Sequence, residues 1–183
     1  MEKPFSLGIL VGRFQTLHLG HVQMIETAVS LCGQVGIFVG SAQESGTSKN
    51  PFPYALRREM LKRLFGDRVE IYPLPDIGVG NVSAWGDYVL ENVQARFGRM
   101  PDLLVSGKEA RRLDWFDSVR GVRIAELYIP KTIEISASQM RSFLLADDRA
   151  RWEQYVDPRI HSLYPALREL VKSAEGKTDT QSI

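Results

Sequence analysis

The sequence contains little cysteine and little histidine, and the chemistry that depends on clusters of these residues is excluded. Its 183 residues include one cysteine, Cys32, and three histidines. A single cysteine excludes an intramolecular disulfide and a zinc site built from several thiolates. We interpret Cys32, which lies among apolar residues, as a core residue. A histidine metal site is unfavoured too, because His18 and His21 lack a third ligand nearby and His161 lies far along the chain. We predict no metal ligand from the protein.

The chain also lacks an excess of charge and a long apolar run. It has 23 Lys and Arg against 22 Asp and Glu, a net charge of +1. Bulk attraction to nucleic acid or to an acidic membrane surface is therefore not expected. No apolar run approaches the roughly 20 residues of a membrane span, and residues 1–13 do not resemble a signal peptide. We predict a cytoplasmic protein that binds neither nucleic acid nor membrane.

Apolar runs alternate with amphipathic stretches along the chain, and this pattern indicates the fold class. We expect strands over 6–11, 35–40, 69–74, 103–106 and 122–127, and helices over 21–31, 54–65, 82–97, 110–116, 138–146, 151–155 and 158–171. Such alternation is typical of right-handed crossovers. It predicts an α/β fold with a parallel five-stranded sheet, helices on both faces and additional C-terminal helices. We predict one domain over 1–172 and a flexible tail over 173–183.

The first strand leads directly into GRFQTLHLGH, residues 12–21, which we interpret as a phosphate site. Ligands of parallel sheets bind beyond the carboxyl ends of the strands, where this segment must lie. A helix that begins there offers free N–H groups and the positive end of its dipole. Arg13, His18 and His21 add donors, and Gly20 lets a phosphate approach the backbone. We expect a triphosphate as the ligand.

A second basic motif, ISASQMR, covers residues 135–141. Ser136 and Ser138 offer hydroxyl groups at a helix start, where either could cap the helix. Arg141, one turn later, can hold an anion with its planar fork of donors. Alone, this motif is no more than a helix-capping sequence. Together with the first motif, it indicates the second half of one anion site.

The pair of motifs, HxGH and [ST]-x-[ST]-x-x-R, resembles the nucleotidylyltransferase superfamily. Within it, the chain resembles the archaeal-type nicotinamide mononucleotide adenylyltransferases. The other segments that carry this resemblance are GSAQESGTSKNPFPYALR (40–57), NVSAWGDYV (81–89) and VSGKE (105–109). The resemblance spans roughly residues 5–170 and implies a Rossmann-like sheet. It also implies the reaction of ATP with nicotinamide mononucleotide to give NAD and pyrophosphate, Mg²⁺ brought with ATP, and a homo-oligomer.

The resemblance also implies roles for individual residues. Arg13, His18 and His21 would contact the ATP phosphates and Arg57 and Arg141 the β and γ phosphates, while Trp85 would stack on the nicotinamide ring. The expected catalytic residues are His18, His21, Arg13 and Arg141. The expected ATP-binding residues are Gly12, Arg13, Phe14, His18, Gly20, His21, Arg57, Ser136, Ser138 and Arg141. The expected mononucleotide-binding residues are Ser41, Asn81 and Trp85. A plain core role for Trp85 stays open, and Lys108 is interpreted as a surface charge.

The reaction suits these residue types. The 5′-phosphate of the mononucleotide is already an anion, so catalysis needs positioning and electrostatic stabilisation rather than a strong base. The sequence departs from the family at Thr16, where proline is common, at Gly46, where histidine is common, and at Ala137, where glycine is common. No departure removes an expected phosphate ligand.

Three alternatives stay open at this point. The chain could transfer an adenylyl or cytidylyl group to another phosphorylated small molecule, although the 41–53 loop and Trp85 argue against this. It could be a fragment of a class I aminoacyl-tRNA synthetase, but it is short and lacks a KMSKS-type loop and a basic excess. It could also bind a nucleotide as a sensing module without turnover.

Overall fold

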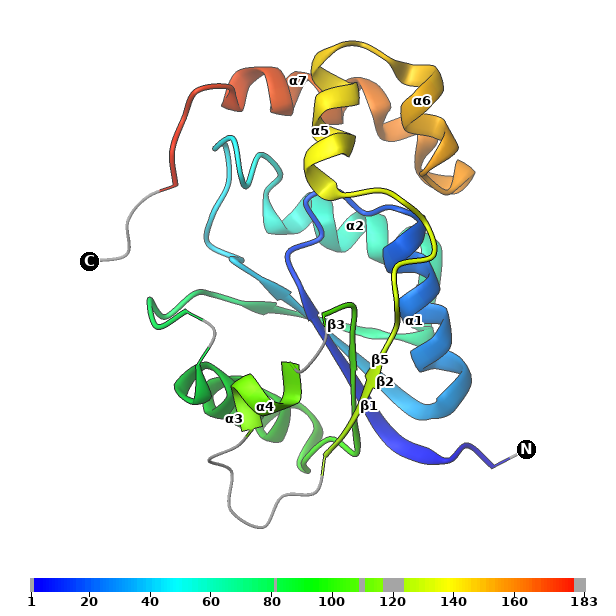
Figure 1. Cartoon of the computed structure of the whole chain (residues 1–183), viewed down its shortest axis with the longest axis vertical. Helices are drawn as coiled ribbons and strands as arrows, with labels where there is room; N and C mark the ends of the chain where they lie inside the picture. Colours follow the sequence, from blue (N-terminus) through cyan, green and yellow to red (C-terminus); the bar gives the residue numbers. More distant parts are fainter. Residues whose placement is uncertain (1, 81, 109–110, 117–123, 180–183) are drawn as a thin grey trace.

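The sheet has five strands, all parallel, as predicted. The structure is a computed structural model that describes residues 2–80, 82–108, 111–116 and 124–179 (Figure 1). The strands are β1 (Phe5–Gly12), β2 (Cys32–Gly40), β3 (Glu70–Leu74), β4 (Leu103–Ser106) and β5 (Ala125–Tyr128). Their spatial order is β3-β2-β1-β4-β5, and every pairing is parallel. The predicted α/β class and five-stranded parallel sheet are confirmed.

The helices agree with the predicted ones to within a few residues at most ends. They are α1 (Leu19–Leu31), α2 (Tyr54–Phe65), α3 (Ser83–Phe97), α4 (Arg111–Phe116), α5 (Ala137–Leu145), α6 (Arg149–Gln154) and α7 (Tyr164–Ala174), with short 3₁₀ helices at Gly66–Arg68 and Pro158–Leu163. The helix expected over 158–171 is therefore two elements. Residues 122–123 of the expected fifth strand lie outside the described residues.

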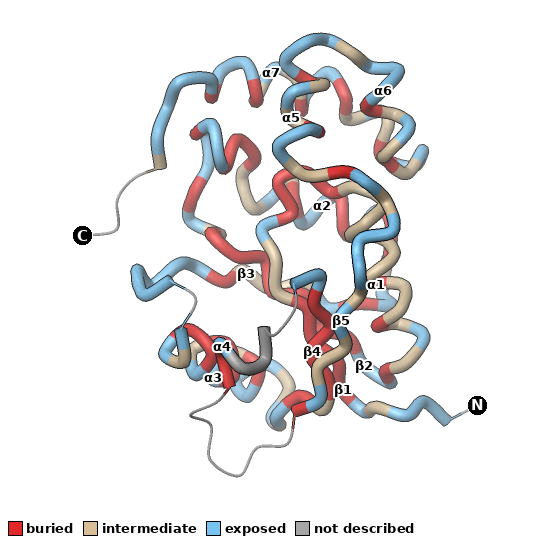
Figure 2. Tube along the Cα trace, in the orientation of Figure 1, coloured by how far each residue is buried: buried red, intermediate tan, exposed pale blue. Residues whose placement is uncertain are grey.

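Side-chain alternation along the strands divides the core into two layers. In β1, Leu10 joins a cluster with α1 and α2, whereas Leu7 and Ile9 join a cluster with α3 and α4. The same alternation puts Val105 of β4 on the first face and Leu104 on the second. Figure 1 shows α1 and α2 on one side of the sheet and α3 and α4 on the other, and the central strands are buried (Figure 2). Helices α5 to α7 extend the first cluster.

The segment predicted as a flexible tail makes hydrogen bonds at Lys177 and Asp179, and its flexibility stays a prediction. Helix α7 ends at Ala174, and the chain then lies against the loop between β2 and α2. The Ser48 N–H donates to the Lys177 carbonyl (2.9 Å), and Asn50 Nδ2 donates to Asp179 Oδ1 (3.1 Å), which also accepts from the Thr47 hydroxyl. The polar residues that suggest a frayed end are thus partners for a buried polar loop. Within the described ranges, no helix is both long and apolar enough to cross a bilayer.

Candidate active site

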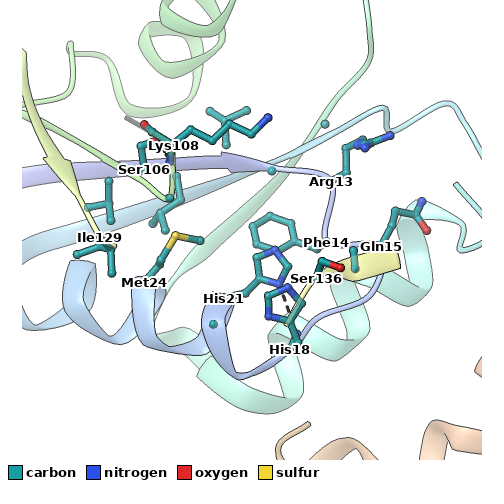
Figure 3. A pocket seen from close by; sticks show the side chains of 18 of the residues that line it. Arg13, Phe14, Gln15, His18, His21, Met24, Ser106, Lys108, Ile129 and Ser136 are labelled. Carbon is teal, nitrogen blue, oxygen red and sulfur yellow. Dashed lines mark hydrogen bonds between the residues drawn. The ribbon is translucent and has the colours of Figure 1, made fainter. Parts of the chain in front are cut away.

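A cavity of about 700 Å³ opens at the carboxyl ends of the strands, a size that suits a small-molecule ligand (Figure 3). Loops that are far apart in the sequence form its wall. The lining residues come from 10–24, 40–41, 76–85, 104–108 and 129–141, together with Trp115. The first and last basic motifs, which the sequence places at opposite ends of the chain, therefore meet at one cavity.

The two histidines of the first motif lie together at the start of α1. His18 is the N-cap residue and His21 is in the first turn, and their ring centroids are 3.8 Å apart. The His18 backbone N–H donates to His21 Nδ1 (3.4 Å), the contact drawn in Figure 3. A neutral imidazole that accepts at Nδ1 carries its proton at Nε2. His21 is thereby prepared to donate to a ligand through Nε2.

Both imidazoles are neutral at neutral pH. Burial, and to a smaller extent the nearby Lys131 ammonium, lower the pKa of His18 to about 4. Burial also lowers the pKa of His21 well below its usual value, and His18 adds to that shift. A bound polyanion would favour the protonated forms of both rings and raise both pKa values. The pair can therefore supply neutral donors, or positive charge when an anion is close.

Arg141 is held at the cavity by the first loop. Its Nη1 donates to the Gln15 carbonyl (2.6 Å), and its Nη2 donates to the Ser138 hydroxyl (3.2 Å). Arg141 and Ser136 line the cavity, but Ser138 does not. Ser136 caps α5 by accepting from the Gln139 N–H (3.2 Å). Of the two serines predicted to bind ATP, Ser136 thus faces the cavity and Ser138 contacts Arg141.

Arg57 is not where the resemblance implies. It is fully buried (0% exposed) and is absent from the cavity lining. Its Nη1 donates to the carbonyls of Arg13 (2.9 Å) and Gly40 (2.8 Å), and its Nη2 donates to the Ser41 carbonyl (2.9 Å). Because these oxygens end β1 and β2 and point at the guanidinium, Arg57 fixes the two loops behind the cavity instead of reaching a phosphate.

Two turns held by Arg57 have left-handed backbone at residues other than glycine. Phe14 has φ 52° and Ser41 has φ 48°. This conformation costs about 1–2 kcal/mol per residue without glycine, and such strain is concentrated at functional sites. Both residues line the cavity directly after a strand end. The cost is offset by the three hydrogen bonds from Arg57, which hold the flanking carbonyls.

Two guanidinium groups, those of Arg13 and Arg141, line the cavity. Arg13 is exposed and lines the cavity, and its charge contributes to lowering the pKa of both Arg57 and Arg141, after burial. For Arg57 the pKa falls to about 10. Neighbouring guanidinium groups repel one another, and an anion bound between them would stabilise their charged forms. An anion bound between Arg13 and Arg141 would therefore be stabilised.

Glycines and aromatic residues shape the rest of the cavity. Gly12, Gly20 and Phe14 all line it. A Cβ at Gly20 would lie 3.1 Å from the His18 ring, so this glycine makes room for His18. Trp85 is 8% exposed, lines the cavity and packs on Tyr88 with ring centroids 5.4 Å apart. Trp85 is therefore both a core residue and part of the wall. Asn81 lies outside the described residues.

Sequence reasoning missed several lining residues. Lys108, interpreted as a surface charge, lines the cavity opposite the histidines (Figure 3). Lys131 and Gln15 also line it. Lys131 follows β5, so the rule that ligands bind beyond strand ends could have found it. At Thr16, where the family commonly has proline, the loop is fixed in place, because Thr16 is buried and Gln15 beside it is anchored to Phe52.

Comparison with known proteins agrees with this geometry. The profile of the cytidylyltransferase-like family matches residues 9–147. The chain belongs to this family. Nicotinamide-nucleotide adenylyltransferase from Pyrococcus furiosus is 40% identical over 182 residues, 96% of this chain and 91% of the relative. The same enzyme from Pyrococcus horikoshii is 34% identical over 180 residues, with the same coverage of both chains. The predicted membership of the nicotinamide-nucleotide adenylyltransferases is confirmed.

Solved structures confirm the Rossmann-like fold. A bifunctional NMN adenylyltransferase/ADP ribose pyrophosphatase from Francisella tularensis superimposes with a TM-score of 0.72 at 20% identity. The match covers 92% of this chain and 53% of that one, so this chain spans about half its length. The same protein in complex with AMP and a manganese ion gives a TM-score of 0.67 at 20% identity over 92% of this chain and 52% of that one.

Proposed function

We propose that the chain transfers the adenylyl group of ATP to nicotinamide mononucleotide, giving NAD and pyrophosphate. The observation that carries the proposal is the convergence of the histidine pair and Arg141 on one cavity, from segments near opposite ends of the chain. Similarity to nicotinamide-nucleotide adenylyltransferases over 96% of the chain supports the same conclusion. Transfer to another phosphorylated molecule and a sensing module without turnover are not favoured.

The chemistry needs no covalent intermediate. A 5′-phosphate oxygen of the mononucleotide attacks the α-phosphorus of ATP in line. The new P–O bond forms as the bond to pyrophosphate breaks, and pyrophosphate leaves with the electron pair. His18 and His21 would donate to the α-phosphate oxygens, while Arg13 and Arg141 would hold the β and γ phosphates. These donors stabilise the charge of the transition state more than that of the bound substrate.

Magnesium enters the proposal as part of the substrate, Mg·ATP. Among the described residues, no three His, Cys, Asp or Glu side chains are grouped as metal ligands. Of the lining residues in the described ranges, Asp76 is the sole carboxylate. Mg²⁺ keeps several waters and binds well to phosphate oxygens. We therefore propose that triphosphate oxygens and water supply most of its ligands, and that it screens the approach of the two anions.

The mononucleotide would lie on the opposite side of the ATP phosphates from Arg141. Trp85, which lines the cavity, would stack on the nicotinamide ring, and Ser41 and Asn81 would contact the mononucleotide. Ser41 lines the cavity and its carbonyl is fixed by Arg57, which supports this assignment. A homo-oligomer is also part of the proposal, to be tested by size-exclusion chromatography with light scattering.

The decisive experiment is product formation. Purified protein is incubated with ATP, Mg²⁺ and either nicotinamide or nicotinate mononucleotide, with phosphopantetheine as an alternative acceptor. We expect a dinucleotide by chromatography and an equal amount of pyrophosphate, both absent without Mg²⁺. Tight ATP binding with no dinucleotide from any acceptor would favour the sensing module. Product from phosphopantetheine alone would favour transfer to another substrate.

A further inference from the structure

Gln15, a residue of the first motif with no expected role, joins two loops of the cavity. It is buried, with 1% of its surface exposed. Its Nε2 donates to the Phe52 carbonyl (3.0 Å), and its Oε1 accepts from the Phe52 N–H (2.9 Å). One side-chain amide thus satisfies both backbone groups of a residue 37 positions away. In Figure 3 the Gln15 side chain points away from the histidines.

The backbone of Gln15 has a different partner. Its carbonyl accepts the 2.6 Å hydrogen bond from Arg141 Nη1. A bond from a guanidinium is charge-assisted and stronger than a neutral one. The other hydrogen-bond partner given above for Arg141, Ser138, belongs to the same helix α5 and cannot orient that helix toward the first loop. The direction of the Arg141 fork therefore depends on where the Gln15 carbonyl lies.

The anchor at Phe52 is itself rigid. Phe52 is fully buried in the core cluster of α1 and α2. The loop that precedes it is held at Thr47 and Asn50, both buried, by hydrogen bonds to Asp179. A leucine would fill the space of Gln15 without the desolvation of an amide. The Gln15 amide instead links two loops, a task that an apolar core residue could not perform.

We propose that Gln15 is a positioning residue that aims Arg141 at the ATP phosphates before ATP binds. The inference rests on the proposed function, in which Arg141 holds the β and γ phosphates. An arginine that is already oriented loses less conformational freedom on binding, so the anion binds more tightly. Loss of the two bonds to Phe52 should let the Gln15 carbonyl shift, and the Arg141 fork would shift with it.

The test is a double-mutant cycle with Gln15→Ala, Arg141→Ala and the combined variant. For each protein, kcat/KM is measured for ATP and for the mononucleotide. We expect Gln15→Ala to lower kcat/KM for ATP about tenfold, the factor that corresponds to about 1.4 kcal/mol, mainly through KM. In the Arg141→Ala background, Gln15→Ala should change kcat/KM for ATP less than twofold, because its effect passes through Arg141.

Three results would overturn the inference. If Gln15→Ala lowered kcat/KM for ATP equally in both backgrounds, Gln15 would act on the fold alone. If Gln15→Ala had the wild-type kcat/KM, Gln15 would have no positioning role. If Arg141→Ala is itself as active as the wild type, the proposed role of Arg141 fails and the inference falls with it. Dinucleotide formation by the wild type tests the reaction separately from either role.

Folding is controlled in two ways. Gln15→Glu keeps the acceptor for the Phe52 N–H and loses the donor, and it replaces Gln15→Ala in the cycle if that variant does not fold. The matched control is Gln34→Ala, because Gln34 is an exposed glutamine that accepts from Arg99 (3.0 Å) far from the cavity. We expect this control to keep the wild-type kcat/KM for both substrates.

Discussion

The two sides of the cavity differ in how completely they are built before a ligand arrives. On the phosphate side, formed by Arg13, His18, His21 and Arg141, hydrogen bonds connect segments from both ends of the chain. Residues 76–80 and Trp85 form another part of the wall, where we propose that the mononucleotide binds, and on this mononucleotide side apolar side chains are left in solvent. Ile77 is 43% exposed and Val79 is 40% exposed, and both line the cavity.

This difference separates two sources of affinity. Pre-oriented donors bind an anion at a small entropic cost, so the phosphate side should act as a rigid template. Exposed apolar groups gain free energy when a ring covers them, so the mononucleotide side should act through burial. Variants of the two sides should therefore differ in which kinetic constant they change.

The largest effect is expected for His21→Ala on the phosphate side. Removing a donor that strengthens in the transition state should lower kcat by about 10²–10³-fold, with a much smaller change in ATP affinity. Rapid-quench kinetics and ATP titration measure the two quantities. His161→Gln is the control, since His161 does not line the cavity. Equal losses in kcat and ATP affinity would contradict a transition-state role for His21.

Arg57 tests whether a guanidinium beside the phosphate side can be purely structural. Arg57→Ala should lower the free energy of unfolding by about 3 kcal/mol or more, because three carbonyl oxygens lose their buried donor. Arg58→Ala, the exposed neighbour on α2, should stay within about 0.5 kcal/mol of the wild type. Chemical denaturation measures both. If Arg57→Ala were as stable as the wild type but had a much higher KM for ATP, Arg57 would bind the ATP phosphates, as the resemblance implies.

The Arg57 example illustrates what could be predicted from the sequence. The sheet and its order of elements follow from local patterns, and the rule about strand ends brings the two basic motifs together. The burial of Arg57 depends on left-handed turns at Phe14 and Ser41. Because neither residue is glycine, the sequence does not indicate these turns. Gln15 has its partner 37 residues away, and no local pattern marks such a pair. The hydrogen bonds of Asp179 with Thr47 and Asn50 likewise join polar residues far apart in the sequence, and no local pattern marks them.

Trp85 tests the mononucleotide side. Trp85→Ala should raise KM for the mononucleotide about tenfold, since stacking on an aromatic ring contributes about 1–3 kcal/mol, and should change KM for ATP less than twofold. Val89→Ala is the matched control, because Val89 is fully buried in the same core cluster but does not line the cavity. Both variants should lose thermal stability. An unchanged KM in Trp85→Ala would leave the tryptophan as a core residue alone.

A pH dependence of stability is expected from the phosphate side alone. The pKa of His18 is about 4 in the folded protein, against 6.5 for an ordinary histidine. Between these values the unfolded chain binds a proton that the folded chain does not, so stability falls as the pH drops from about 6.5 to 4. Because His18 is only partly buried, we expect a loss of about 1–3 kcal/mol. His21 acts in the same direction, because its pKa is also lowered.

The histidine contribution is isolated by comparing denaturation curves of the wild type and the double variant His18→Asn, His21→Asn, since the carboxylates are the same in both. The wild type should lose more stability than the variant between pH 6.5 and 4. ATP should reverse the sign of this effect, because a polyanion raises both histidine pKa values. Calorimetry near pH 5 in two buffers of different ionisation enthalpy should then detect proton uptake when ATP binds to the wild type and less uptake in the variant. Parallel stability curves with no difference in proton uptake would mean that the triphosphate does not bind beside these rings.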